Sequence, residues 1–202
     1  MSSPGRLYLE RLGIRSEVRS FFEPYLNQTC GEIIFKYGHS AEHVNHDFHF
    51  IPTTEVLWTA GNFDLAGHIF ICGSAMDALS FLHLHYHVYH THLFFAAVGT
   101  SPSPAQLEPL IHPKKQYHLV FSKDELGAIC DLKAASYIRK SPIKIIANEN
   151  CFNLTFRSKN YPVKNLSLHA LEKAAGFHFN IPVSKPKKHN TFYEQLKYGH
   201  PG

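Results

Sequence analysis

The sequence predicts an α/β protein with a central parallel sheet, helices on both faces of that sheet, a small N-terminal α+β lead-in and a C-terminal extension. Two observations lead to this class. Short apolar runs rich in β-branched and aromatic residues alternate with segments of helical periodicity through the middle of the chain, and such alternation is typical of parallel strands joined by right-handed crossovers. The length of 202 residues and the hydrophobic content of 44% suit one core of ordinary size with appendages.

The alternation is clearest at residues 68–81. Residues 69–72 form an apolar run like that of a strand buried on both faces. Gly73 and Ser74 interrupt the run, and Ser74 is placed to cap the next helix by accepting a backbone N–H. The elements expected in this central region are strand 68–72, helix 75–88, strand 93–98, helix 103–110, strand 117–121, helix 125–140 and strand 143–147.

The flanking regions are expected to hold smaller units. On the N-terminal side, two short helices precede a loosely alternating stretch that is typical of a small antiparallel sheet. On the C-terminal side we expect a strand, a helix closed by Gly176, and a tail helix. The ranges are helices 6–14 and 17–25, strands 32–37 and 47–52, strand 152–156 and helix 167–175. The chain therefore divides into a lead-in region 1–62, a central domain 63–150 and a basic C-terminal extension 151–202.

Composition limits the classes of protein that fit. No apolar run approaches the roughly 20 residues of a membrane helix. The N-terminus carries Arg6, Glu10 and Arg11 where a secretory signal would be apolar, so we expect a cytoplasmic protein. The cysteines lack the C-x-x-C spacing of a metal or redox motif, and we expect reduced, buried thiols. They are Cys30, Cys72, Cys130 and Cys151.

The positive charge is concentrated at the C-terminal end. Residues 155–202 hold 8 Lys and Arg against 2 Asp and Glu, whereas residues 1–154 hold 12 against 14. Lysines near aromatic residues can bind nucleic acid by phosphate contact and base stacking. The candidates for such binding are Lys185, Lys187, Lys188 and Lys197. The alternatives are a solvated basic surface and a tail helix docked by Phe192, Tyr193 and Leu196.

Three segments in the central region resemble the motifs of one family. The segments are residues 68–81, with Asp77 in an Asp-Ala-Leu segment, residues 93–100, and residues 119–127. In order and spacing they are similar to the motifs of the Toprim domain, which occurs in bacterial-type primases, topoisomerases and related nucleases. Residues 8–18 resemble the helical region that precedes this domain in primase-like proteins, and the end of the chain resembles the segment that closes it. The resemblance implies a Toprim-like, Rossmann-like sheet of the primase-like branch, with ligands at the carboxyl ends of its strands.

The resemblance also implies a degenerate active site. A Toprim enzyme uses a glutamate as general acid or base and an Asp-x-Asp pair to hold Mg²⁺. Gly73 stands at the glutamate position and Ser122 at the first aspartate, so only Asp124 remains, followed by Glu125 and Gly127. We therefore expect no confident cofactor and at most weak Mg²⁺ binding, with Asp124 as its candidate ligand.

The remaining acidic residues at these motifs have other possible roles. Asp77 is either a site carboxylate or a first-turn aspartate favoured by the helix dipole. Asp124 is either a residual metal ligand or the cap of the helix that begins at residue 125.

A histidine-rich segment covers residues 83–92. On a helix, His83 and His87 would share a face at i and i+4, a spacing that can bind a transition metal. The alternatives are a polar, partly exposed helix face and a pH-sensitive surface. The segment has no H-E-x-x-H glutamate, so it does not specify a catalytic zinc site.

Together these observations favour a Toprim-like protein that binds more than it catalyses. The first expectation is a nucleic-acid-associated accessory factor of a replication, mobilisation or repair system that uses the basic C-terminal region. One alternative is a residual Mg²⁺-dependent nucleotidyl transferase or nuclease in which Asp77, Asp124 and Glu125 replace the lost ligands. A second alternative is a structural interaction module.

Overall fold

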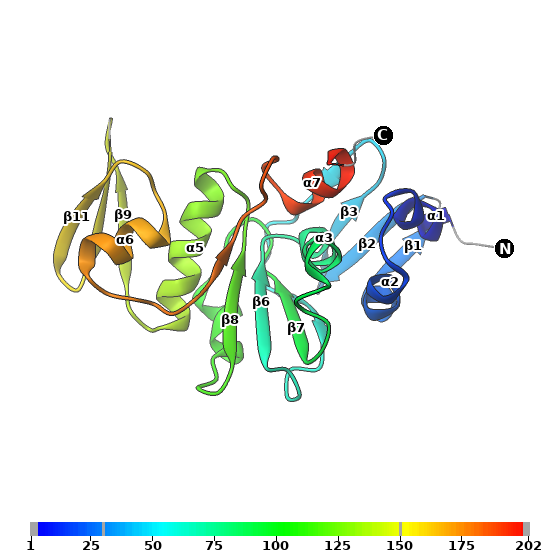
Figure 1. Cartoon of the computed structure of the whole chain (residues 1–202), viewed down its shortest axis with the longest axis horizontal. Coiled ribbons are helices and arrows are strands. Elements are labelled where there is room, and N and C mark those ends of the chain that lie inside the picture. Colours follow the sequence, from blue (N-terminus) through cyan, green and yellow to red (C-terminus); the bar gives the residue numbers. More distant parts are fainter. Residues whose placement is uncertain (1–3, 30, 150, 200–202) are drawn as a thin grey trace.

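The protein is built around a five-stranded sheet that contains four parallel strands and one antiparallel edge strand (Figure 1). The structure is a computed structural model and describes residues 4–29, 31–149 and 151–199. The strands lie in the order β12 (Val183–Ser184), β8 (Gln116–Val120), β6 (His68–Cys72), β7 (Leu93–Ala97) and β5 (Trp58–Gly61). The predicted α/β class with a central parallel sheet is therefore confirmed.

Helices cover both faces of this sheet because its central strands are apolar on both sides. Along β6, Phe70 and Cys72 face one core cluster, while Ile69 and Ile71 face the other. On the first face lie α2 (Ser16–Phe22) and α3 (Ala75–His85), and α7 (Phe192–Tyr198) packs against α3. Helix α1 (Pro4–Arg11) joins the same core cluster from the lead-in region. On the second face lie α4 (Pro104–Leu107), the 3₁₀ turn η2 (Glu108–Leu110) and α5 (Glu125–Ile138), and α6 (Leu168–Ala175) packs against α5 as part of the same core cluster.

The N-terminal region forms the expected antiparallel lead-in. After α2 and the 3₁₀ turn η1 (Glu23–Tyr25), four strands pair in sequence order. They are β1 (Asn27–Thr29), β2 (Glu32–Tyr37), β3 (Ser40–Val44) and β4 (His49–Phe50). The predicted strand 47–52 is reduced to the two residues of β4. Buried side chains of this sheet belong to the same core as α3, so the lead-in is packed on the central sheet.

The prediction that residues 143–147 extend the central parallel sheet is wrong. The strand exists as β9 (Ile143–Ala147), but it pairs antiparallel with β10 (Phe152–Phe156), which pairs in turn with β11 (Lys159–Val163). Burial explains the difference, because β9 is only half buried whereas β6 is buried over nearly its whole length. A strand with one exposed face suits a small antiparallel sheet. The place beside β8 is taken by β12.

Several local predictions are confirmed with small changes in the boundaries. Ser74 caps α3 by accepting the backbone N–H of Asp77 at 3.0 Å. Gly176 ends α6 in the left-handed conformation, at φ 61°. The tail helix α7 is docked by buried Phe192, Tyr193 and Leu196, which is the structural alternative for the C-terminal segment.

Two of the cysteines are buried as expected. Burial raises the pKa of the Cys130 thiol to about 11 and that of the Cys72 thiol well above its ordinary value. Cys151 is partly exposed, and Cys30 lies outside the described residues. Among the described residues, no helix combines the length and apolarity needed to cross a membrane.

Candidate functional site

The motif positions predicted from the sequence lie at one edge of the central sheet. Gly73 directly follows β6, and Ser122 follows β8 after one residue. The two strands are parallel neighbours, with Cys72 opposite Val120 in the register, so the turns after them lie side by side. We call residues 73–77 and 122–127 the motif edge. The structure therefore brings together the positions that the resemblance predicted.

Gly73 leaves space for a side chain that the sequence does not supply. A Cβ atom added there would meet only the Phe121 ring, at 3.6 Å, which is an ordinary van der Waals distance. Gly127 is different, because a Cβ there would lie 2.0 Å from the Ser122 carbonyl oxygen. The start of α5 therefore requires glycine at 127, whereas the surroundings of residue 73 would accommodate a side chain.

Asp124 acts as the cap of α5. Its Oδ1 accepts the backbone N–H of Gly127 at 2.8 Å and the hydroxyl of Ser122 at 2.6 Å. This satisfies one of the free N–H groups of the first helical turn. Of the two roles expected for Asp124, the structure assigns the helix cap, and the hydroxyl at 122 adds to it.

Asp77 is buried beneath the C-terminal helix. Its Oδ1 accepts the backbone N–H of Tyr193 at 2.9 Å, which joins the first turn of α3 to the first turn of α7. Burial raises the pKa of Asp77 to about 6, and the hydrogen bond from Tyr193 opposes that rise. The carboxylate therefore holds α7 in place.

A third carboxylate at this edge was not found from the sequence. Glu42 on β3 is fully buried, and it accepts the backbone N–H groups of Ala75 and Met76 at 2.7 and 2.9 Å. It also accepts the hydroxyl of Tyr37 at 2.7 Å and contacts Nε2 of His49 at 2.8 Å. A carboxylate at a helix N-terminus is favoured by the free N–H groups and the dipole. The alternation of β3 places Glu42 and buried Val44 on one face, which was the available signal.

The C-terminal segment covers part of the motif edge. Nζ of Lys185 lies 2.6 Å from Oδ2 of Asp131 and donates to the Ser122 carbonyl at 2.8 Å. The backbone N–H of Lys123 donates to the carbonyl of Asn190 at 2.7 Å. Asp131 is 1% exposed; burial raises its pKa to about 6, and Lys185 opposes that rise. Lys185 therefore holds the fold together through an ion pair.

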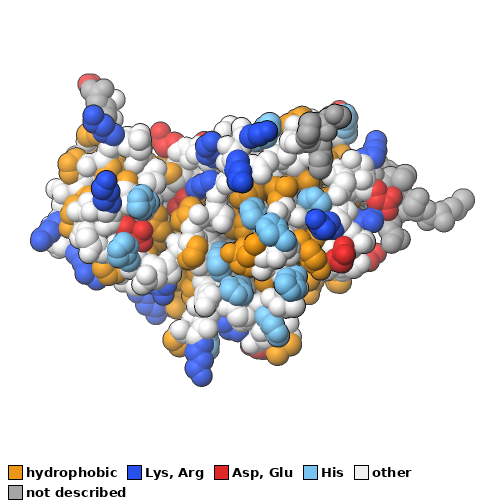
Figure 2. Space-filling model, viewed as in Figure 1, with side chains coloured by type: hydrophobic (Ala, Val, Ile, Leu, Met, Phe, Trp, Pro, Cys, Tyr) orange, Lys and Arg blue, Asp and Glu red, His pale blue; other side chains and the backbone are white. Residues whose placement is uncertain are grey.

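The remaining candidate lysines differ in exposure. Lys197 donates to the carbonyl of His46 at 2.8 Å and lies over the rings of Tyr193 and Tyr198. Lys187 and Lys188 are exposed. Figure 2 shows Lys and Arg side chains gathered at the upper rim of the molecule, over the segment that leads into α7.

The histidine segment does not form the predicted helical pair. Helix α3 ends at His85, so His83 lies on the helix and exposed His87 lies in the turn beyond it. Nδ1 of His83 accepts the backbone N–H of Arg15 at 3.1 Å. In the described part of the chain, no group of three or more His, Cys, Asp or Glu side chains could hold a metal ion.

The residues at the motif edge do not fit Mg²⁺, which needs several hard oxygen ligands in near-octahedral geometry. Of the carboxylates found there, Glu42 and Asp77 are buried and already accept hydrogen bonds from backbone N–H groups, and Asp124 caps α5. Glu125 is exposed in the first turn of α5. The arrangement is suited to holding α3, α5 and α7 against the sheet.

Comparisons with known proteins indicate the fold. No family model matches the sequence, and no curated protein matches it. Among solved structures, the chain is similar to the primase fragment of the bacteriophage T7 primase-helicase protein, with a TM-score of 0.51 and 14% sequence identity. The match covers 95% of this chain and 70% of that one. The chain therefore has a primase-like α/β fold.

Proposed function

We propose that the protein is a catalytically degenerate Toprim-like factor that binds nucleic acid as an accessory to replication, mobilisation or repair. The observation that carries this proposal is the use of the carboxylates at the motif edge. Asp124 caps α5 and Asp77 holds α7, and the two further positions where the resemblance expects a carboxylate are Gly73 and Ser122. In this proposal the edge corresponds to an enzyme site that lacks the acidic groups needed for its metal.

Nucleic acid is the partner that the fold and the charge distribution favour. The fold is primase-like, and the exposed side chains include Lys123 in the motif edge and Lys187 and Lys188 beside it. Lysines at such an edge gain affinity by displacing counterions from phosphates. Lys185 is neutralised by its ion pair with Asp131 and Lys197 contacts the carbonyl of His46, so the proposal does not depend on these two lysines.

Binding to labelled oligonucleotides across a salt series tests the proposal. The wild-type protein is expected to bind a fluorescent strand of about 20 nucleotides, or its duplex, with affinity that falls steeply with salt. In the double variant Lys187→Glu/Lys188→Glu, the slope of log binding constant against log salt concentration is expected to become less negative by roughly 1.5, because two phosphate contacts are lost. Lys36→Glu, on an exposed position of β2, is the matched control for charge reversal.

Two results would contradict the proposal. The first is the absence of oligonucleotide binding at low salt, which would favour a structural interaction module. The second is Mg²⁺-dependent cleavage or primer synthesis that Asp124→Ala abolishes. That result would favour the residual enzyme in which Asp77, Asp124 and Glu125 serve as ligands.

A further inference from the structure

The lobe formed by β9, β10, β11 and α6 carries a concentration of positive charge far from the motif edge. Residues 139–175, which run from the end of α5 through α6, hold seven Lys and Arg against two acidic residues, Glu149 and Glu172. Figure 2 shows Lys and Arg side chains distributed around this lobe, at the left of the molecule. The lysines considered for the proposed function lie elsewhere, so this charge has no role in it.

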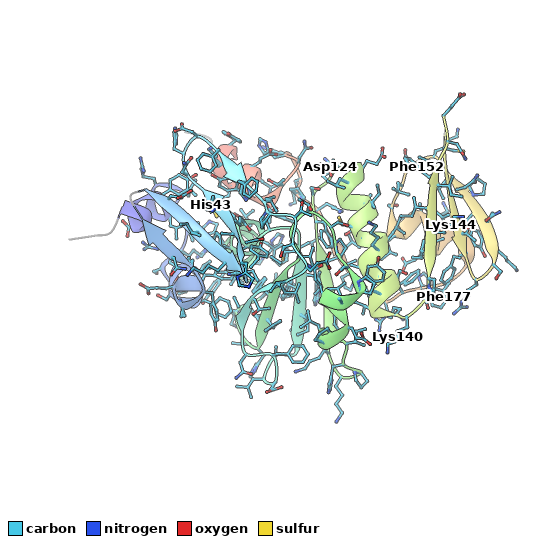
Figure 3. The ribbon with its side chains drawn as sticks, turned by 180° about the vertical axis from the view of Figure 1, so that it is seen from behind. His43, Asp124, Lys140, Lys144, Phe152 and Phe177 are labelled. Atoms are coloured by element: carbon cyan, nitrogen blue, oxygen red, sulfur yellow. The ribbon has the colours of Figure 1, made fainter. Side chains whose placement is uncertain are left out.

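Part of this charge surrounds a cavity where α5 meets the small sheet. The cavity has a volume of about 500 Å³, and its lining includes three cationic side chains and three hydroxyl groups but no carboxylate. The residues that line it are Lys140, Ser141, Pro142, Lys144, Thr155, Phe156, Arg157 and Ser158. Figure 3 shows Lys140 at the end of α5 and Lys144 on the neighbouring strand β9. Like charges gathered without acidic partners attract an anion.

The cations are positioned by the fold without being neutralised by it. The Arg157 guanidinium lies 4.2 Å from the centre of the Phe177 ring and 5.2 Å from that of Phe156. Lys144 lies opposite Thr155 in the register of β9 and β10. Within the described part of the chain, none of Lys140, Lys144 and Arg157 forms an ion pair. Their charges are therefore available to a ligand.

Three residues that line this cavity have a backbone conformation that glycine adopts more easily than other residues. Lys140, Arg157 and Ser158 have φ values of 49°, 49° and 61°, in the left-handed region that favours glycine. Arg157 and Ser158 form the two-residue loop between β10 and β11, where Asn-Gly is preferred. Three of the five non-glycine residues with positive φ in the described ranges line this one cavity. Cationic and hydroxyl side chains thus occupy positions where glycine would be easier to accommodate.

We propose that this cavity binds a phosphate group of a nucleic-acid backbone. This inference rests on the proposed function and adds a second contact surface to it. The exposed face of the small sheet beside the cavity presents no aromatic side chain for base stacking; its residues are Lys144, Ile146, Asn153, Thr155, Asn160 and Pro162. Contact through phosphates alone positions a strand without reading its sequence.

Charge reversal at the cavity tests the proposal in the full chain. Lys140→Glu with Lys144→Glu is compared with Lys36→Glu by fluorescence anisotropy, with the labelled strand of about 20 nucleotides and its duplex as probes. The affinity of the cavity variant is expected to fall by about tenfold or more at low salt, and its salt dependence is expected to flatten. The control is expected to bind within about twofold of the wild-type protein.

A second pair of variants separates binding from folding. Lys140→Gly removes one cation and relieves the left-handed backbone, so its unfolding midpoint should stay level or rise while its affinity falls severalfold. His92→Gly relieves an exposed position with φ 55° outside the cavity, and it should leave the affinity unchanged. Equal affinity of the Lys140→Gly, Lys140→Glu/Lys144→Glu and wild-type proteins would overturn the cavity proposal.

The outcomes distinguish this proposal from the proposed function. If Lys187→Glu/Lys188→Glu weakens binding and the cavity variants do not, the cavity proposal fails and the proposed function stands. If the wild-type protein binds neither probe at low salt, both fail. Cavity-dependent binding to vesicles of phosphatidylglycerol without oligonucleotide binding would assign the phosphate to lipid and overturn the nucleic-acid proposal.

Discussion

The two ends of helix α5 differ in how their polar groups are used (Figure 3). At the N-terminal end, Asp124 accepts hydrogen bonds from Ser122 and Gly127 and so completes the helix. At the C-terminal end, Lys140 lines a cavity with Lys144 and Arg157, and no acidic group lines it. At the end that resembles an enzyme motif, the polar groups stabilise the helix. At the end without a motif, the positive charges of the lysines and the arginine have no acidic partner in the cavity lining. A residue that matches a motif, such as Asp124, can therefore have a purely structural role.

Glu42 gives the largest effect expected at the motif edge. In Glu42→Gln one carboxylate oxygen becomes an NH₂ group at a fully buried position, so a backbone N–H of Ala75 or Met76 faces a donor in place of its acceptor. The free energy of unfolding, measured in urea, is expected to fall by about 3 kcal/mol. Glu32→Gln, which alters a half-buried contact with His43 on the same sheet, should cost less than about 1 kcal/mol. Equal midpoints would show that Glu42 does not hold α3.

Asp77→Asn is expected to change the pH dependence of stability. The pKa of Asp77 is about 6 in the folded protein and about 4 when unfolded, so stability is lost as the pH rises between these values. Asparagine can still accept the Tyr193 N–H, and it is expected to raise the free energy of unfolding at pH 7 by about 2 kcal/mol. Urea unfolding at pH 4 and pH 7 measures this difference. Asp64→Asn, at an exposed site, should leave the change in unfolding free energy between pH 4 and pH 7 as it is in the wild-type protein.

Placing carboxylates at the two positions where the Toprim resemblance expects them tests whether the edge can form a metal site. Gly73→Glu with Ser122→Asp is expected to raise the affinity for Mn²⁺ or Mg²⁺, measured by calorimetry, by about tenfold or more. The neutral variant Gly73→Gln with Ser122→Asn has the same volume and should bind no better than the wild-type protein. No gain in the acidic variant would mean that the edge no longer converges on one site.

The cap at Asp124 gives the smallest effect. Asp124→Ala is expected to lower the free energy of unfolding by about 1 kcal/mol, whereas Asp124→Asn should cost only a few tenths, because asparagine is also a good cap. Thermal unfolding of both variants measures the difference. A loss in Asp124→Asn as large as that in Asp124→Ala would indicate that the negative charge has a role beyond capping.

Much of the fold was predictable from local patterns. The strand–turn–helix at residues 68–85 follows from an apolar run, Gly73 and the cap at Ser74, all of which act over a few neighbours. Residues 143–147 were predicted as a strand of the central sheet, but they form β9, which pairs with β10 in the small antiparallel sheet. A short apolar run indicates a strand but does not specify its partner, because pairing depends on which distant strand competes for the sheet edge.

The candidate site was predicted in part. Gly73, Ser122 and Asp124 meet at one edge as expected, because parallel strands end together. Glu42 was missed, since its contact with Ala75 and Met76 joins residues more than 30 positions apart. The spacing of His83 and His87 predicted a shared helical face, but α3 ends between them.

The sequence by itself determined the α/β class and the positions of most helices and strands, because these depend on composition and on neighbours within one or two turns. Only the tertiary structure decided that β12 fills the edge beside β8, that Asp77 is bound to α7, and that Lys140, Lys144 and Arg157 surround one cavity. These arrangements join segments far apart in the chain, and their free energy comes from burial and pairing that exist only after the chain has folded.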